Sequence, residues 1–315
     1  MGITIREAYG NALAKYGRGD DRIVVLDADV SSSTKSGIFA AACPERFFNV
    51  GICEQNMVAM AAGMAAAGKI PFVNTFAVFL ATLGSLSARE LIAYADLNVK
   101  LIGAYGGLSD SYDGASHHSI EDLAFFRAIP GMTVLVASDE VLTENLIRLA
   151  VETPGPMYIR LSRDEMEHLY PKDETFAIGK GKVLRDGSDV VIFACGVMSG
   201  RALEAAKLLA EKGIRAAVVD LFSLKPVDAE LIRRYAQKTG AVVAAEEHNV
   251  IGGLGSSVAE VLADAGLGVK LERIGVQDTF TESGSYAALS KKYHLLPEDI
   301  AAAAERAAAA KRQHP

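Results

Sequence analysis

The sequence predicts an α/β protein in which a parallel sheet with helices on both faces is followed by a smaller α/β unit. Short apolar runs rich in β-branched residues, such as RIVVL at 22–26 and TVLVA at 133–137, alternate with segments of helical spacing. Continuous apolar runs suit strands that are buried on both faces, as in parallel sheets. The alternation stops in the polar stretch RDEMEHLYPKDET and then begins again. We therefore predict a first domain over 1–165, a linker over 166–178 and a second domain over 179–315.

Composition excludes several classes of partner. The chain has 315 residues, enough for two domains with their own cores, and its net charge is −7. This charge argues against general nucleic-acid binding and against attraction to acidic membranes. No apolar run reaches the length of a membrane span, and the first residues lack the features of a signal peptide. The three cysteines form no Cys-x-x-Cys pair and fit buried thiols of a cytoplasmic protein.

The elements of the first domain follow from local patterns. A helix over 5–15 is expected to be capped by Thr4, and the strand over 22–26 ends in the polar loop DADVSSST. A short strand over 47–52 leads into an Ala- and Met-rich helix over 56–67. The remaining expected elements are strands at 70–74, 99–104, 133–137 and 157–161, helices at 77–95 and 139–152, and a helix opened by SIED at 119–122.

The second domain repeats the alternation on a smaller scale. We expect a turn or hairpin at 179–187, strands at 189–194, 216–220, 241–245 and 269–274, and helices at 200–212, 228–238 and 255–262 followed by two more. The run GGLGSS at 252–257 lacks the Gly-x-Gly-x-x-Gly spacing of a dinucleotide site. We interpret it as a tight turn between a strand and a helix.

Glu54 is the single acid in an apolar run that extends from Phe48 to Phe79. Burial of an unpaired carboxylate is costly, so its place between a strand and a helix needs a reason. It is either a first-turn acid favoured by the helix dipole or a functional group. Phe76 and Phe79 are spaced to share one face, which fits either core packing or support of a flat heterocycle.

Further polar candidates lie where strands end. Asp29 and Ser33 follow the first strand, where α/β proteins bind ligands, although a capped turn also favours these residues. Asp113 and His117 lie on the Gly-rich loop DGASHH and are suited to polar contacts with a substrate, with histidine as an acid or base. Because adjacent histidines seldom point at one ion, a metal pair at 117–118 is the less favoured alternative.

Two arginines complete the candidates. Arg6 lies near the start of the first helix, and Arg163 follows the last strand of the first domain. The fixed donor fork of a guanidinium suits phosphate. An isolated exposed arginine is usually only solvated, so neither residue decides the matter alone.

Taken in order, these segments resemble the transketolase family of thiamin-diphosphate enzymes, but only the last two of its three domains. GICEQNM is similar to the segment around the family's catalytic Glu, and TFAVF to the aromatic segment that holds the aminopyrimidine ring. DGASHHSIEDLAFFRAIPGMTV resembles the substrate loop and the helix after it. LSR at 161–163 resembles the end of the pyrimidine-binding domain, and IREAYGNAL and DADVSSS resemble its opening helix and first loop.

This resemblance implies a pyrimidine-binding thiamin-diphosphate domain followed by a transketolase C-terminal domain. Glu54 would contact the pyrimidine nitrogen and act in catalysis together with His117. By the same resemblance, the cofactor would be held by Phe76 and Phe79 with Asp29 near it, the sugar phosphate by Arg6, Ser33 and Arg163, and the donor hydroxyls by Asp113 and His117.

The family's Gly-Asp-Gly motif, which holds the diphosphate through a metal, is absent from the sequence. The resemblance therefore implies the C-terminal subunit of a split transketolase, whose N-terminal partner brings a divalent metal, Mg or Ca. Two copies of each subunit would form an α2β2 assembly that transfers two-carbon ketol units between sugar phosphates, a reaction of pentose phosphate metabolism. Tyr105, Tyr112 and Thr82 stand where family members commonly have other residues, and they leave the donor and acceptor open.

Three alternatives remain beside this interpretation. The β subunit of a 2-oxoacid dehydrogenase E1 component has the same two domains, but the sugar-phosphate residues argue against it. A deoxyxylulose-phosphate synthase has a similar loop, but it normally carries its metal domain in the same chain. A non-catalytic subunit with a relict site is disfavoured by the intact Glu54, Phe76 and Phe79.

Overall fold

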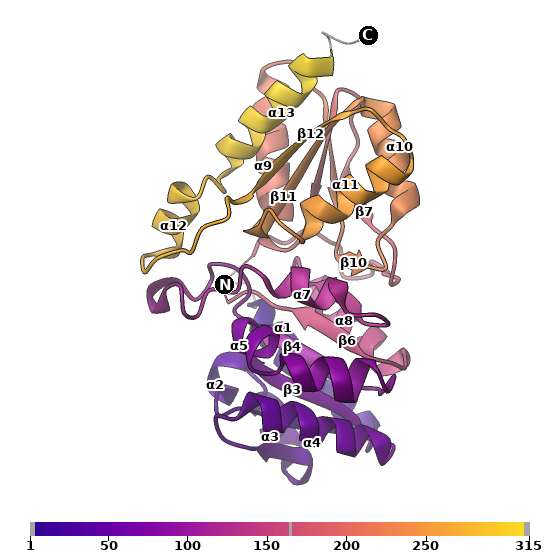
Figure 1. Ribbon diagram of the computed structural model, residues 1–315, viewed down its shortest axis with the longest axis vertical. Helices are drawn as coiled ribbons and strands as arrows, with labels where there is room; N and C mark the ends of the chain where they lie inside the picture. Colours follow the sequence, from indigo (N-terminus) through magenta and orange to yellow (C-terminus); the bar gives the residue numbers. More distant parts are fainter. Residues whose placement is uncertain (1–3, 164–165, 312–315) are drawn as a thin grey trace.

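Two sheets, one in each half of the chain, form the framework of the computed structural model (Figure 1). The structure describes residues 4–163 and 166–311. The predicted domain boundary at 165 and the outermost residues of the two predicted domains, 1–3 and 312–315, lie outside the described residues. The first sheet has seven strands in the order β10-β5-β6-β4-β3-β1-β2, and the second has five in the order β12-β11-β8-β9-β7.

The first sheet is parallel except for one edge strand, which the second half of the chain supplies. Strand β10 (Ser223–Lys225) crosses over and pairs antiparallel with β5. The parallel strands are β1 (Ile23–Asp27), β2 (Phe47–Asn49), β3 (Ile70–Phe76), β4 (Lys100–Ala104), β5 (Thr133–Val136) and β6 (Met157–Arg160).

Helices cover both faces of this sheet, which explains the continuous apolar runs. In β1, Ile23 and Val25 pack into one hydrophobic cluster, whereas Val24 and Leu26 pack into another. The first cluster includes α1 (Ile5–Gly19) and α8 (Glu140–Glu152), and the second includes α4 (Glu54–Ala66) and α7 (Asp122–Ala128). Shorter helical segments are α2 (Ser31–Thr34), α3 (Gly37–Ala42), η1 (Pro44–Arg46), α5 (Ala77–Thr82), α6 (Ser85–Ser87), η2 (Ala88–Ala93) and η3 (Ser111–Asp113).

The second half has the same layered design. Its strands are β7 (Lys182–Arg185), β8 (Val190–Ala194), β9 (Ala216–Asp220), β11 (Ala241–Asn249) and β12 (Lys270–Val276), and only β7 runs antiparallel to its neighbour. Its helices are α9 (Val197–Glu211), α10 (Ala229–Thr239), α11 (Leu254–Asp264), α12 (Tyr286–Lys292) and α13 (Pro297–Lys311).

The structure revises several predicted elements. The predicted helix over 77–95 is three segments, because Thr82 and Ser85 direct their hydroxyls to the carbonyls of Val78 and Thr82, both at 2.7 Å, and Gly84 follows the first segment. Residues 179–187, predicted as a turn or hairpin, contain the single strand β7, which pairs with β9.

Two further differences concern the second half and the segment that leads into it. Strand β11 continues through EEHN to Asn249, so these polar residues belong to the sheet. The predicted linker has buried anchors, because Tyr170 and Phe176 pack with Phe222 in one hydrophobic cluster.

None of the helices in residues 4–163 and 166–311 has both the length and the apolar composition that crossing a bilayer requires.

Candidate active site

Glu54 begins α4, directly after the loop that follows β2. Its side chain is almost completely buried, and Thr75 at the end of β3 donates a hydroxyl hydrogen bond to Glu54 Oε1 at 3.1 Å. Within the described part of the chain, this is the only hydrogen bond recorded for the carboxylate. Glu54 also lines a pocket of about 640 Å³ with apolar neighbours that include Leu83 and Leu91. A buried carboxylate at a pocket is placed to contact a ligand. An acid that served only the helix dipole would have no need of burial.

Phe76 directly follows Thr75, the partner of Glu54, at the junction of β3 and α5, and Phe79 lies one turn further on in α5. Their ring centroids are 6.0 Å apart with an interplanar angle of 27°. Both side chains are only half-buried, which is unusual for core residues. The ring of His117 meets both, at 6.2 Å from Phe76 and 5.3 Å from Phe79. The pair therefore presents an aromatic surface next to a histidine.

Tyr105 joins this aromatic surface to the two arginines. It directly follows β4 with a positive φ of 61°, and its ring centroid lies 4.6 Å from that of Phe76. The Cζ atoms of Arg6 and Arg163 lie 5.0 and 5.3 Å from the same ring centroid. Cations over a tyrosine ring gain from its quadrupole, so this arrangement holds two guanidinium groups side by side despite their like charge.

Hydrogen bonds fix Arg6 in this cluster. Its Nη1 donates to the Ser33 carbonyl at 2.6 Å and to the Tyr105 hydroxyl at 2.9 Å, and its Nε donates to the Arg163 carbonyl at 3.2 Å. Arg6, Ser33 and Arg163, predicted separately from the sequence, are thus brought together. Ser33 contributes its backbone carbonyl to this contact.

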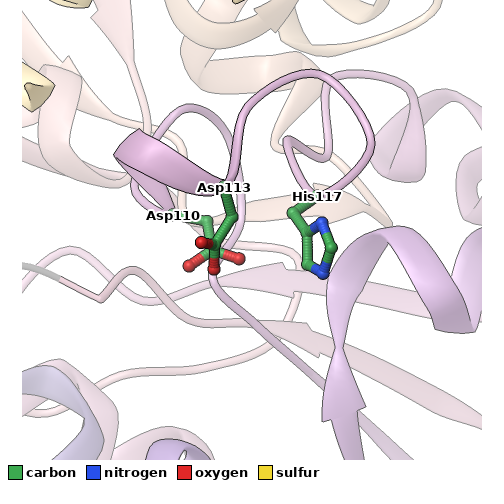
Figure 2. Close-up of side chains that lie close together, drawn as sticks. All are labelled: Asp110, Asp113 and His117. Carbon is green, nitrogen blue, oxygen red and sulfur yellow. The ribbon is translucent and has the colours of Figure 1, made fainter. Parts of the chain in front are cut away.

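The loop after β4 brings a group of acids and a histidine to the same place (Figure 2). Ligand atoms of Asp110, Asp113 and His117 all lie within 4.8 Å of one another. Asp110 is buried, and Arg163 Nη1 lies 3.4 Å from its Oδ1. Burial, and next the charge of Asp113, raise the pKa of Asp110 to about 6. Two carboxylates and an imidazole can bind a divalent cation, but the Arg163 guanidinium already supplies positive charge here, so we assign no metal to them.

The second half of the chain braces this loop through His118. Its Nδ1 lies 2.7 Å from Thr281 Oγ1, and its Nε2 lies 3.1 Å from the Ser111 carbonyl. Burial lowers the pKa of His118, which favours a neutral ring. The adjacent histidines therefore have different contacts. His117 faces the aromatic pair, and His118 connects the loop to the second half of the chain.

Asp29 lies apart from these groups. It has a φ of 65°, and its Oδ1 accepts a hydrogen bond from Asn49 Nδ2 at 2.7 Å. None of the contacts recorded among the described residues links it to Glu54 or to the aromatic pair. Its loop is shaped by buried Asp27, which accepts hydrogen bonds from the Val30 amide and from the Thr34 and Ser36 hydroxyls.

The pocket at Glu54 fits one part of thiamin diphosphate and not the other. Among the described residues only Oε1 of this buried carboxylate has a recorded hydrogen bond, so its other oxygen suits the polar edge of a flat pyrimidine. The described residues that line the pocket include no lysine or arginine to bind a diphosphate. Exposed apolar side chains surround it, with Ile52 79%, Leu83 55% and Leu91 43% exposed.

Comparisons with known proteins agree with this geometry. The family model "Transketolase, pyrimidine binding domain" matches residues 1–168, and "Transketolase, C-terminal domain" matches residues 179–300. The chain belongs to the transketolase family. Members of this family depend on thiamin diphosphate, and the chain carries the family's last two domains, as the C-terminal sections of split transketolases do.

Individual transketolase relatives match the chain almost from end to end. The "Putative transketolase C-terminal section" of Methanocaldococcus jannaschii is 45% identical over 299 residues, covering 94% of each chain. The "6-deoxy-6-sulfo-D-fructose transketolase subunit SqwH" of Clostridium sp. is 41% identical, covering 95% of this chain and 93% of that protein. A solved structure described as "Split gene transketolase, inactive beta4 tetramer" has a TM-score of 0.90 at 48% identity and covers 99% of this chain and 100% of that one.

Sequence reasoning missed three residues of the candidate site. Thr75, the partner of Glu54, belongs to a strand and carries no local signal of function. Tyr105 is flagged by the sequence only as a departure from the family, although its position directly after a parallel strand favours a ligand site. Asp110 lies in a polar loop whose tight turn cannot be foreseen from composition.

Proposed function

We propose that the chain is the C-terminal subunit of a split transketolase, which with an N-terminal subunit transfers two-carbon ketol units between sugar phosphates by means of thiamin diphosphate. One observation carries the proposal. Thr75 binds Glu54 and precedes Phe76 in the chain. The Phe76 ring lies 4.6 Å from the Tyr105 ring, and Arg6 and Arg163 lie over that same tyrosine ring. A continuous path thus joins a site for a heterocycle to a site for an anion, with hydroxyl-binding groups beside it.

In this proposal Glu54 holds or releases a proton at the pyrimidine nitrogen, and Thr75 orients its carboxylate. Phe76 and Phe79 support the ring. When bound, thiamin diphosphate supplies a nucleophilic carbon that accepts the two-carbon unit and returns it to an aldose. Asp29 stays a predicted neighbour of the cofactor, although its recorded contact is with Asn49.

The sugar phosphate is placed by the groups at the other end of the path. Arg6 and Arg163 suit the terminal phosphate, since guanidinium forks match phosphate geometry. Asp113 and His117 suit the hydroxyl groups of the donor, and His117 is close enough to the aromatic pair to exchange a proton near the reacting carbon.

The N-terminal partner is proposed because the Glu54 pocket lacks groups for the diphosphate. A subunit with a Gly-Asp-Gly motif would hold the diphosphate through Mg or Ca, and the exposed apolar rim around Glu54 fits coverage by another chain in an α2β2 complex. The related structure described as an inactive β4 tetramer supports the need for a second kind of subunit.

The test uses the chain and its partner purified together, with thiamin diphosphate and Mg²⁺ or Ca²⁺. Each of a set of ketose phosphates labelled with ¹³C at C1 and C2 is incubated with an unlabelled aldose phosphate. We expect NMR to find both labels in a longer ketose when both subunits are present, and no transfer with either subunit alone. Full transfer by this chain alone would contradict the split-subunit proposal, and decarboxylation of pyruvate or branched-chain 2-oxoacids would favour an E1 component.

A further inference from the structure

We propose that Asp110 is a positioning residue of this site: its buried carboxyl shares one proton with Asp113 and forms the ion pair that orients Arg163. Its role in turnover rests on the proposed function. The shared proton does not, because it depends only on the geometry of this chain.

The two carboxyl groups are brought together by a tight turn. Segment η3 (Ser111–Asp113) is a 3₁₀ turn, Asp110 precedes it, and the Asp113 amide donates to the Asp110 carbonyl at 3.4 Å. Residues three apart in a 3₁₀ turn project in the same direction. Figure 2 shows the two carboxyl groups side by side below the turn, with the His117 ring facing them. The ligand atoms of these three residues lie within 4.8 Å of one another.

Asp110 has a buried oxygen that its surroundings leave unsatisfied. The residue is 2% exposed, and among the described residues its Oδ2 has no hydrogen-bond partner. Such an oxygen costs free energy in a dry site, and two neighbouring carboxylates oppose each other's ionisation. One proton held between the pair removes both penalties. Asp113 is exposed, so this proton can exchange with water.

The other charged groups around the pair set its net charge. Arg163 lies 3.4 Å from Asp110 Oδ1, and His117 faces the pair from the same loop. The Arg6 guanidinium also lies over the Tyr105 ring, and its Nε donates to the Arg163 carbonyl. Burial, and next the charge of Asp113, raise the pKa of Asp110 to about 6, while His117 and Arg163 act in the opposite direction. When Asp110 and Asp113 together carry one negative charge, they neutralise the Arg163 guanidinium and leave that of Arg6 for a bound anion.

Asp110 therefore links the two ends of the substrate site. Through Asp113 it affects the group that receives the hydroxyls, and through Arg163 it affects the group that receives the anion. A bound anion that draws Arg163 away from Asp110 would strengthen the hold of the pair on its proton. We expect proton uptake and anion binding to be coupled here.

The direct test is a ¹³C NMR titration of the folded chain alone, labelled at the aspartate Cγ positions. Asp110→Asn and Asp113→Asn identify the two signals by their loss. We expect Asp110 to titrate near 6, to fall by about one unit or more in Asp113→Asn, and to rise in Arg163→Met. Glu121→Gln removes an exposed acid of the same region and should leave the titration unchanged. The shared proton would be overturned by an Asp110 signal with an ordinary aspartate pKa, or by an Asp110 pKa that is the same in Asp113→Asn as in the unmodified chain.

A second measurement tests the positioning role in the assembled complex. The pH profile of kcat/KM is compared between the unmodified enzyme and Asp110→Asn on one substrate, so that titration of the substrate's phosphate cancels. We expect an inflection near pH 6 that the variant lacks. Equal profiles would overturn the positioning role. A coupled titration in a complex that transfers no ketol unit would instead overturn the proposed function and leave the shared proton intact.

Discussion

The two ends of the site differ in how complete they are within one chain. The anion end, our name for the proposed anion site at Arg6, Tyr105 and Arg163, joins α1 and α2 to the loops after β4 and β6. Arg6 is held there by three hydrogen bonds and lies with Arg163 over one tyrosine ring. At the Glu54 end, the one hydrogen bond that the described residues offer to the acid comes from Thr75, and the pocket opens among exposed leucines and Ile52.

The difference shows which part of the proposed site one chain organises by itself. The anion end can be organised before assembly, because its guanidinium groups already have partners. The Glu54 end keeps an apolar rim that is costly to leave in water and is suited to a protein surface.

The largest effect is expected from Glu54→Gln. Glutamine keeps the size of the side chain and can still accept the Thr75 hydrogen bond, so the fold should be preserved. It cannot hold or release the proton that the cofactor chemistry requires. We expect kcat of the two-subunit complex to fall about 10²- to 10⁴-fold with little change in the KM for sugar phosphates. The measurement is steady-state kinetics at saturating thiamin diphosphate.

The control for this variant is Gln55→Ala, which alters the neighbouring exposed residue that lines the same pocket. It should retain most of the activity. A Glu54→Gln enzyme with full turnover would favour the view that this chain is a non-catalytic subunit.

A smaller effect is expected when the rim of the Glu54 pocket is made charged. Leu83 is 55% exposed and lines the pocket, so Leu83→Asp would bury a charge wherever a partner covers it. We expect the affinity for the N-terminal subunit to fall about 30-fold, the loss typical of a disrupted interface centre. Sedimentation velocity across a range of concentrations measures this affinity.

Ile251→Asp provides the matched control, because Ile251 is 58% exposed on the second half of the chain. This variant should assemble normally if the interface lies around Glu54. Equal loss of assembly in both variants would show that the contrast between the two ends does not locate the partner.

Much of the fold could be predicted from the sequence because its signals are local. The run RIVVL predicts β1, and the structure buries alternate residues of that strand in the two opposite hydrophobic clusters. The prediction of one helix over 77–95 was wrong, because apolar spacing continues through Gly84. The breaks between the three segments depend on hydroxyl contacts to carbonyls, which spacing does not reveal. Strand β10 was missed because three residues that pair with a distant strand carry no periodic pattern.

The site was predictable where residue type alone restricts chemistry, as for Glu54, the two phenylalanines and the arginines. The meeting of Arg6, Ser33 and Arg163 depends on tertiary structure, since these residues are far apart in the sequence. Asp110 was invisible for a different reason: its significance lies in burial and in a 3₁₀ turn, neither of which a polar loop sequence reveals.

The smallest effect is expected from Tyr105→Phe, which tests whether the anion end is complete without a partner. The change removes the hydroxyl that accepts from Arg6 Nη1 at 2.9 Å and keeps the ring between Phe76 and the two guanidiniums. Arg6 retains its bonds to the carbonyls of Ser33 and Arg163. Loss of one hydrogen bond of about 0.5–1.5 kcal/mol predicts a roughly two- to tenfold weaker affinity of the isolated chain for a ketose phosphate, measured by calorimetry.

Tyr112→Phe is the matched control, since Tyr112 is 71% exposed on the same loop and should not contribute. If the isolated chain binds ketose phosphate and only Tyr105→Phe weakens that binding, the anion end is organised before the partner arrives. If the isolated chain binds no ketose phosphate at all, the guanidinium pair needs the second subunit as much as Glu54 does, and the contrast between the two ends disappears. The outcome also bears on Arg163, because a preformed anion end requires its guanidinium to be held by Asp110 and Tyr105 within this chain.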